Sequence, residues 1–201
     1  AKNDDFQALA ARIVEAVAAN AATTVEAASA LTLASGQTVA EEIGALAGVA
    51  ASQGARLRHV KAHGQLYNMA VNNEGLTRAL AQATYDVDKE LVFFCLAGTK
   101  MLTIAESMGL KVASEVFGDR TYSPDGTLSP RNKPGAMIED VNVSIKQVLQ
   151  MAQKGTITAV DGSTVHVRAD TLCIHGDQPG AAAFAKAIRE ALIAEGIEVG
   201  V

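Results

Sequence analysis

Three clusters of polar, potentially reactive side chains each follow a short apolar run of the sequence. They occupy residues 59–68, 115–131 and 175–179. In parallel α/β folds, ligands bind at the carboxyl ends of the strands, because loops and the amino ends of helices converge there. We therefore expect the three clusters to contribute to one shared site.

The first cluster contains an ionisable ring, His63, that could act as a general base, a metal ligand or a group that polarises a carbonyl. A histidine after a strand can equally be a hydrogen-bonded core residue. Lys61 and His59 alternate with His63, so they should lie on the same face for as long as the strand continues. A lysine at the buried end of a strand needs an anionic partner, from the protein or from a substrate. Tyr67 and Asn68 would orient a substrate or cap the turn that follows.

The second cluster is the longest stretch without a helical pattern, and a loop of this length in a compact domain usually has a function. Its polar residues include Glu115, Asp119, Arg120, Tyr122 and Arg131. The two arginines could clamp a carboxylate through paired hydrogen bonds. The alternative is an internal network of aspartates and arginines that merely orders the loop.

The third cluster places His175 and Asp177 between an apolar run and a helix that we expect to begin at Pro179. Asp177 or the residue after it could cap this helix. A histidine and an aspartate so close together could also serve acid–base catalysis or bind a hard metal ion, and the helix terminus favours a developing negative charge nearby. Cys173 and Cys95 lie inside apolar runs and are expected to pack in the core.

The elements that must position these clusters alternate between strand and helix patterns. Short apolar runs predict strands at 57–60, 91–96, 112–117 and 171–174. Helical stripes predict helices at 6–17, 76–83, 101–108, 141–149 and 179–195, with the last three ending near Gly109, Gly155 and Gly196 and the second capped by Asn72 or Asn73. A Thr-x-x-Glu capping box at Thr38 predicts one more helix, which stops near Gly54. This alternation indicates an α/β fold with a mostly parallel sheet.

Composition excludes several classes of protein. The 201 residues are 49% hydrophobic and 19% charged, which predicts one globular domain over 1–201. The net charge of −5 argues against a nucleic-acid partner, and no apolar stretch approaches the ~20 residues that span a membrane. Two distant cysteines and the lack of a leader pattern predict a cytoplasmic protein. Glycine-rich nucleotide loops, the Gly-x-Ser-x-Gly elbow and cysteine clusters of zinc-site spacing are all missing from the sequence.

Taken in order, the clusters resemble the signature of the LamB/YcsF family, also called the 5-oxoprolinase A-subunit family. The resemblance rests on His-Val-Lys-x-His-Gly-x-Leu-Tyr-Asn at 59–68 and on Glu-x-Phe-x-Asp-Arg-x-Tyr-x-x-Asp-Gly-x-Leu-x-Pro-Arg at 115–131. It continues through Gly135-Ala136, residues 159–162 and residues 173–181. Ala62 stands where the family usually has proline. Residues 38–201 are family-like, whereas the alanine-rich residues 1–37 do not match the family's amino-terminal motifs.

The resemblance implies a (β/α) barrel of the glycoside hydrolase/deacetylase type, expected to be incomplete at the amino end. It implies ATP-dependent opening of the lactam 5-oxo-L-proline to L-glutamate, with ATP and Mg²⁺ as cofactors and two partner subunits. A homo-oligomer is left open, as is any bound metal. The residues that match the motifs are assigned as catalytic (His63, His175, Asp177) or substrate-binding (His59, Lys61, Tyr67, Asn68, Glu115, Asp119, Arg120, Tyr122, Arg131). Two alternatives are a metal-dependent hydrolase or deacetylase of a small polar amide or sugar, and a non-catalytic binding subunit.

Overall fold

The computed structural model describes residues 28–176 and 180–200, with side chains from Thr38 onward. The chain divides into two compact units, residues 1–91 and residues 92–201. The expectation of a single domain stays a prediction. The helix predicted at 6–17 lies outside the described residues.

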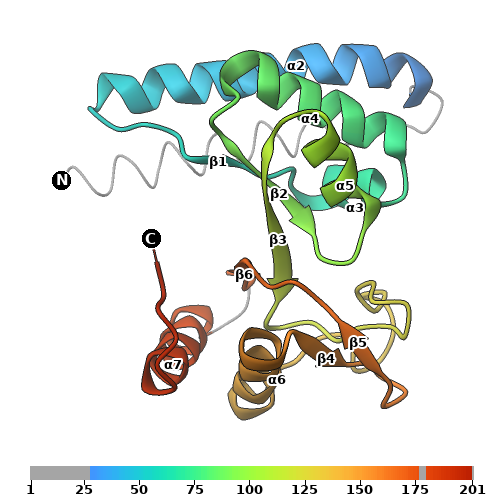
Figure 1. Ribbon diagram of the computed structural model, residues 1–201, viewed down its shortest axis with the longest axis vertical. Helices are drawn as coiled ribbons and strands as arrows, with labels where there is room; N and C mark the ends of the chain where they lie inside the picture. Colours follow the sequence, from blue (N-terminus) through green and yellow to red (C-terminus); the bar gives the residue numbers. More distant parts are fainter. Residues whose placement is uncertain (1–27, 177–179, 201) are drawn as a thin grey trace. The chain divides into compact units, whose positions relative to one another are not determined.

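The first unit contains two helices that lie side by side, α2 (Ala28–Ser52) and α4 (Glu74–Asp88) (Figure 1). The short strand β1 (His59–Val60) and the short helix α3 (Gly64–Val71) connect them along the chain. Apolar side chains from these elements are buried in the core of the unit, among them Ile43, Tyr67, Ala70, Leu76, Leu80 and Ala83. Helix α3 was not expected, because its apolar pattern covers barely two turns.

Helix ends in the first unit follow the sequence signals in two cases out of three. Asn73 caps α4 as predicted, since its side chain accepts a hydrogen bond of 3.0 Å from the backbone N–H of Leu76. Gly54, with φ of +70°, follows the end of α2 as predicted. The predicted helix start at Thr38 is wrong, because α2 already begins at Ala28. Alanine has the highest helix propensity, so the alanine-rich run before Thr38 favours continuing the helix over capping it there.

The second unit is built on three parallel strands, with β3 (Lys111–Phe117) between β2 (Val92–Leu96) and β6 (Thr171–Cys173). Helix α5 (Lys100–Ser107) connects β2 to β3 and packs on both strands. Phe117 pairs with Cys173 in the register of β3 and β6. Because the strands are parallel, the residues that follow β3 and β6 emerge at the same edge of the sheet. These three strands and the α/β class were predicted and are confirmed, whereas the strand expected at 57–60 shortens to two residues.

Helices α6 (Val141–Lys154) and α7 (Ala181–Ala194) pack against each other in the second unit. Their apolar faces, together with side chains of β6, enclose a core cluster centred on Val148, Ile188 and Leu192. Helix α6 ends at Gly155 as predicted, and Gly155 has the left-handed φ of +61° that favours glycine. The described part of α7 begins at Ala181 after Gly180, two residues beyond the predicted start, and Pro179 lies outside the described residues.

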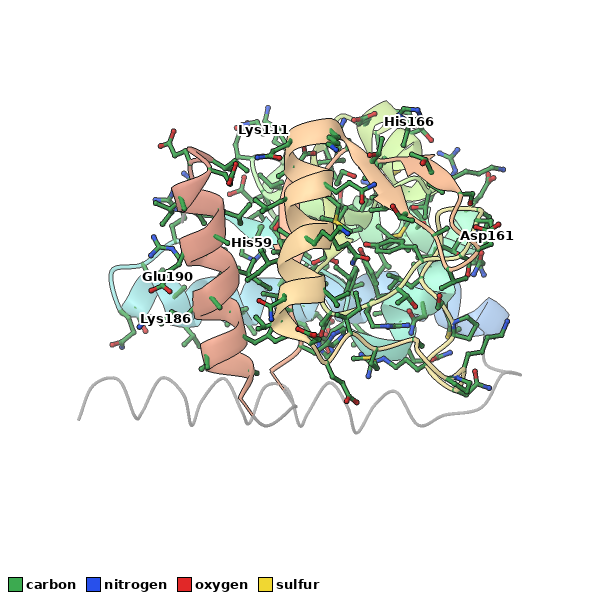
Figure 2. All side chains as sticks on the ribbon, turned by 90° about the horizontal axis from the view of Figure 1, so that it is seen from below. His59, Lys111, Asp161, His166, Lys186 and Glu190 are labelled. Carbon is green, nitrogen blue, oxygen red and sulfur yellow. The ribbon has the colours of Figure 1, made fainter. Side chains whose placement is uncertain are left out.

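A small antiparallel hairpin, β4 (Thr156–Thr158) and β5 (Thr164–His166), follows α6 and was not predicted. Figure 2 shows its exposed His166, and also Lys186 and Glu190, which form an ion pair of 3.8 Å one turn apart on α7. Within the residues that the structure describes, no helix is both long and apolar enough to cross a membrane.

Candidate active site

The long segment between β3 and α6 is an ordered loop that folds back on itself. Arg120 bridges to Met137 and Tyr122 bridges to Leu128, both in antiparallel fashion. Backbone hydrogen bonds tie it further, including 2.9 Å from Ser129 N to Thr121 O and 2.9 Å from Ile138 N to Asp119 O. The loop therefore presents its charged residues in fixed places at the carboxyl end of β3.

Two polar side chains of helix α6 form hydrogen bonds to the first turn of this loop. Ser144 Oγ donates a hydrogen bond of 2.6 Å to the carbonyl of Gly118. Gln147 Nε2 donates to the carbonyls of Phe117 at 3.1 Å and Arg120 at 2.9 Å. Gly118 allows this close approach, since a Cβ there would lie 3.2 Å from Val148 Cγ2. The carbonyls on both sides of Asp119 are thus held by the helix.

Tyr122 is fully buried, and its hydroxyl forms a hydrogen bond inside the second unit. The oxygen accepts a hydrogen bond of 2.8 Å from the backbone N–H of Phe117. Burial raises the pKa of the Tyr122 hydroxyl above its ordinary value, so the side chain stays neutral. In this structure Tyr122 braces the end of β3, and its predicted contact with substrate stays a prediction.

Asp119 and His175 meet at the edge where β3 and β6 end. Asp119 Oδ2 lies 2.7 Å from His175 Nδ1 and accepts a second hydrogen bond of 2.9 Å from the His175 backbone N–H. The side chain of Asp119 is 6% exposed and that of His175 is 21% exposed. The ring of Phe117 stacks on the imidazole with centroids 5.7 Å apart. This buried carboxylate fixes the orientation of a partly accessible histidine ring.

A third charged group, Arg131, determines the tautomer of His175. Arg131 Nη2 lies 2.5 Å from His175 Nε2. A guanidinium has donors and no acceptor, so Nε2 must accept this hydrogen bond and carry no proton. The proton of the neutral ring is then on Nδ1, which donates it to Asp119. The geometry is that of a general base whose second nitrogen is oriented by a carboxylate.

Arg120 is buried close to this group, with its Nη2 donating to the carbonyl of Ser129. Burial lowers the pKa of its guanidinium, the positive charge of Arg131 lowers it further, and the charge of Asp119 acts in the opposite direction. Among the described residues, the buried atoms Arg120 Nε and Asp119 Oδ1 have no hydrogen-bond partner. Buried polar atoms are normally paired, so this corner is suited to receive polar groups from a ligand.

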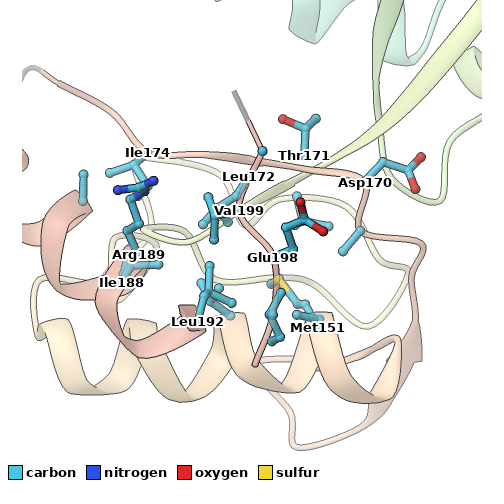
Figure 3. A pocket seen from close by; sticks show the side chains of 17 residues that line it. Met151, Asp170, Thr171, Leu172, Ile174, Ile188, Arg189, Leu192, Glu198 and Val199 are labelled. Atoms are coloured by element: carbon cyan, nitrogen blue, oxygen red, sulfur yellow. The ribbon is translucent and has the colours of Figure 1, made fainter. Parts of the chain in front are cut away.

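Two cavities lie in the second unit and differ in character. A small one of about 50 Å³ borders the pair of Asp119 and His175 and is also lined by Glu139 and Phe184. A larger one of about 380 Å³ is lined mainly by apolar side chains of β3, β6, α6 and α7 (Figure 3). Its apolar walls belong to the core cluster of α6 and α7, so we place the chemistry at the small cavity, where the charged groups converge.

Comparison with known proteins places this arrangement in a family. The family model described as LamB/YcsF family matches residues 32–201. The chain belongs to the LamB/YcsF family. A member from Bordetella pertussis, named as the A-subunit of 5-oxoprolinase, is 56% identical over 161 residues, and one of the same name from Bacillus subtilis is 46% identical over 161 residues.

A solved structure extends the comparison with the LamB/YcsF family to three dimensions. The crystal structure of the lactam utilization protein from Thermus thermophilus is 42% identical and superposes with a TM-score of 0.75. It covers 80% of this chain, which in turn covers 64% of that chain. The Bordetella pertussis relative is matched in the same proportions, 80% of this chain and 64% of the relative. The barrel-type α/β fold predicted from the resemblance is confirmed, and the chain spans just under two thirds of the relatives' length.

The first family motif lies in the other unit. His59 is the first residue of β1 and is exposed, and His63 occupies the position before α3, also exposed. Because β1 ends at Val60, the strand alternation expected to align Lys61 with these histidines does not extend that far. Lys61 Nζ instead lies 5.4 Å from the ring centroid of the buried Tyr67, and Asn68 is exposed on α3. Their roles stay predictions.

The second unit accordingly brings together three of the predicted residues, Asp119, His175 and Arg131, with Arg120 close by. Glu115 is buried within β3, 2% exposed, and Asp177 lies outside the described residues. Sequence reasoning missed Glu139, Ser144 and Gln147, for which no motif gave a signal. Within the described part of the chain no group of three or more His, Cys, Asp or Glu side chains is arranged to hold a metal ion.

Burial determines the state of the two cysteines. Cys95 is fully buried in β2, and this burial, reinforced by the charge of Glu106, raises the pKa of its thiol to about 12. A thiol in this state is a poor nucleophile. Cys173 is half-buried in β6, and the two cysteines form no disulfide with each other, as expected.

Proposed function

We propose that this chain is the A-subunit of a 5-oxoprolinase and that its second unit carries the acid–base site for opening 5-oxo-L-proline to L-glutamate. The observation that carries the proposal is the contact of Asp119 with His175 Nδ1, which leaves Nε2 as the acceptor. The names of the relatives, which call them subunits of 5-oxoprolinase, and of the Thermus structure, lactam utilization protein, support the substrate class.

His175 would act as the general base in this reaction. Its Nε2 would take a proton from the water that attacks the lactam carbonyl carbon. When the ring C–N bond breaks, the same proton would pass to the departing nitrogen, which restores the neutral ring. Asp119, 2.7 Å from Nδ1, would stabilise the positive charge that the ring carries between these two transfers.

Arg120 and Arg131 would hold the anionic group of the substrate. Two guanidiniums suit a carboxylate or a phosphoryl oxygen, because their paired N–H groups match the spacing of its oxygens. ATP with Mg²⁺ would supply the driving force by donating a phosphoryl group to the lactam oxygen, with ADP as the leaving group. After C–N cleavage a second water molecule would release phosphate from the acyl phosphate and give glutamate. We propose that the nucleotide binds to the partner subunits, whose existence the names of the relatives support.

The test is ATP-dependent formation of glutamate from 5-oxo-L-proline by this chain together with its two partner subunits. His175→Gln should lower turnover by ~100-fold or more, the usual scale for an acid–base group. His166→Gln is the matched control, since this histidine is exposed at the end of β5. Equal rates for the His175 variant and wild type would refute the assignment of the base.

A complete absence of glutamate would need one more comparison, because the chain covers 64% of its relatives' length. The Bordetella pertussis relative is then assayed with the same partners. If the relative forms glutamate with these partners and this chain does not, this chain lacks segments that the reaction requires. The proposed activity would then be refuted for this chain.

A further inference from the structure

The contact between Arg131 and His175 blocks the nitrogen that the proposed reaction uses. Arg131 Nη2 donates to His175 Nε2, so the lone pair of that nitrogen is already engaged. A water molecule cannot give its proton to Nε2 while this hydrogen bond persists. In the described state, therefore, the base is oriented by Asp119 and covered by Arg131.

The cavity beside the base agrees with a covered state. Its volume of about 50 Å³ accommodates a few water molecules, each of which needs ~10–15 Å³ on this measure. Pockets that bind small molecules are typically ~300–1,000 Å³. A lactam with its carboxylate therefore requires the site to open. Arg131, which contacts His175 Nε2, does not line this cavity and is exposed.

The two arginines differ in their freedom to move. Arg120 is buried, 6% exposed, and held by the carbonyl of Ser129, whereas Arg131 is exposed. The two positive charges act on each other, as the lowered pKa of Arg120 indicates. Among the described residues, Arg120 Nε has no hydrogen-bond partner. A buried cation with a spare donor and an exposed cation that acts on it form a receptor for an anion.

We propose that Arg131 is a specificity-determining residue that covers His175 Nε2 until an anionic group of the substrate draws it away. A carboxylate or phosphate offers Arg131 a negative charge and two oxygens for paired hydrogen bonds, whereas the neutral imidazole offers one uncharged acceptor nitrogen, so an anion held by Arg120 competes successfully with His175 for Arg131. A neutral lactam has no such group and leaves the base covered. The proposal rests on the proposed function and names its substrate class as anionic lactams.

The direct test is the protonation pattern of His175 in the full chain labelled with ¹⁵N-histidine. The chain has four histidines, and His175→Gln assigns the signal. In the free protein we expect the proton on Nδ1 and an Nε2 signal displaced by the hydrogen bond from Arg131. Adding 5-oxo-L-proline should shift Nε2, whereas 2-pyrrolidinone, the same ring without the carboxylate, should not. Inorganic phosphate, matched in ionic strength with sodium chloride, is the second anionic probe.

Variants in the same loop separate the cover from general charge effects. Arg131→Met should give the uncovered Nε2 signal without any ligand, and neither anion should then move it. Lys133→Met removes the same charge two residues further on and should behave as wild type, because the structure shows no side-chain contact for Lys133 among the described residues. Turnover of the Arg131 variant should lose its preference for 5-oxo-L-proline over 2-pyrrolidinone.

The outcomes distinguish this inference from the proposed function. A shift with phosphate but not with 5-oxo-L-proline would support the cover and overturn the lactam substrate. Binding of 5-oxo-L-proline, seen by saturation transfer to the ligand, without a shift of Nε2 would overturn the cover and leave the proposed function intact. A proton on Nε2 in the free protein, or no shift with either anion, would also overturn the cover.

Discussion

Replacing Tyr122 with phenylalanine removes a single oxygen atom from the interior of the second unit. The ring remains, so apolar burial is unchanged, but the backbone N–H of Phe117 loses the acceptor that lies 2.8 Å away. Tyr122 has no exposed surface, and water therefore cannot replace the lost oxygen without a rearrangement. Removing the acceptor of a buried hydrogen bond costs about 1–3 kcal/mol, which is the expected loss in the free energy of unfolding.

Urea unfolding followed by far-UV circular dichroism measures this loss, with an unchanged dependence on urea showing that the unfolded state is the same. Tyr85→Phe is the matched control. Tyr85 is 40% exposed on α4, so its hydroxyl is solvated and the change should stay within about 0.5 kcal/mol.

The pH dependence supplies a second criterion. The pKa of Tyr122 in the folded chain is raised above its ordinary value of 10.0, so as the pH rises beyond 10 the unfolded state releases this proton first and is stabilised relative to the folded state. The hydroxyl of Tyr122 therefore contributes fully to the free energy of unfolding below pH 10, and its contribution declines above pH 10. The stability gap between wild type and Tyr122→Phe should therefore narrow above pH 10. A gap below about 0.5 kcal/mol at pH 7, or one that does not narrow, would refute the reasoning.

Three further predictions follow from the described contacts. Gln147→Met removes the donors to the carbonyls of Phe117 and Arg120, and it should lower stability by about 1–2 kcal/mol and reduce kcat more than it raises KM, as measured by urea unfolding and steady-state assay. Cys95, whose pKa is raised to about 12, should resist iodoacetamide at pH 8 until the chain is unfolded. Its raised pKa should also make stability fall as the pH rises from about 9 to 12, and this fall should be smaller in Cys95→Ala. Asn73→Ala should destabilise the first unit by about 1 kcal/mol through loss of the α4 cap, detected by faster hydrogen exchange at the start of that helix.

The parts of the fold that the sequence predicted are those in which local pattern and tertiary packing agree. Strand β2 is a continuous apolar run and β3 is mostly apolar, interrupted by Ser114 and Glu115. Both are buried in a parallel sheet, and apolar runs of this kind are recognisable from sequence alone. Asn73 and Gly155 mark helix ends because the cap chemistry is local. At Thr38 a local capping pattern competed with a long alanine-rich helix, and the helix prevailed.

The site was predicted in composition but not in detail. Asp119, Arg131 and His175 follow strands, so their convergence could be expected from the edge of a parallel sheet. The contribution of Ser144 and Gln147 could not be predicted from the sequence. Their partners are backbone carbonyls 26 to 30 residues away, and no side-chain pattern encodes such a contact. The hairpin of β4 and β5 was missed because strands of three residues are too short to show an alternation.

The pairing of β3 with β6 also has a kinetic consequence. Asp119 and His175 are separated by 56 residues, and between them lie the loop, helix α6 and the hairpin. The entropy of closing so long a segment must be overcome before their contact forms, and contacts of this kind slow folding. While a growing chain leaves the ribosome, the carboxylate emerges well before its histidine. The dyad is therefore absent from every partly synthesised form that ends before His175, and it can form while α7 is still to be made.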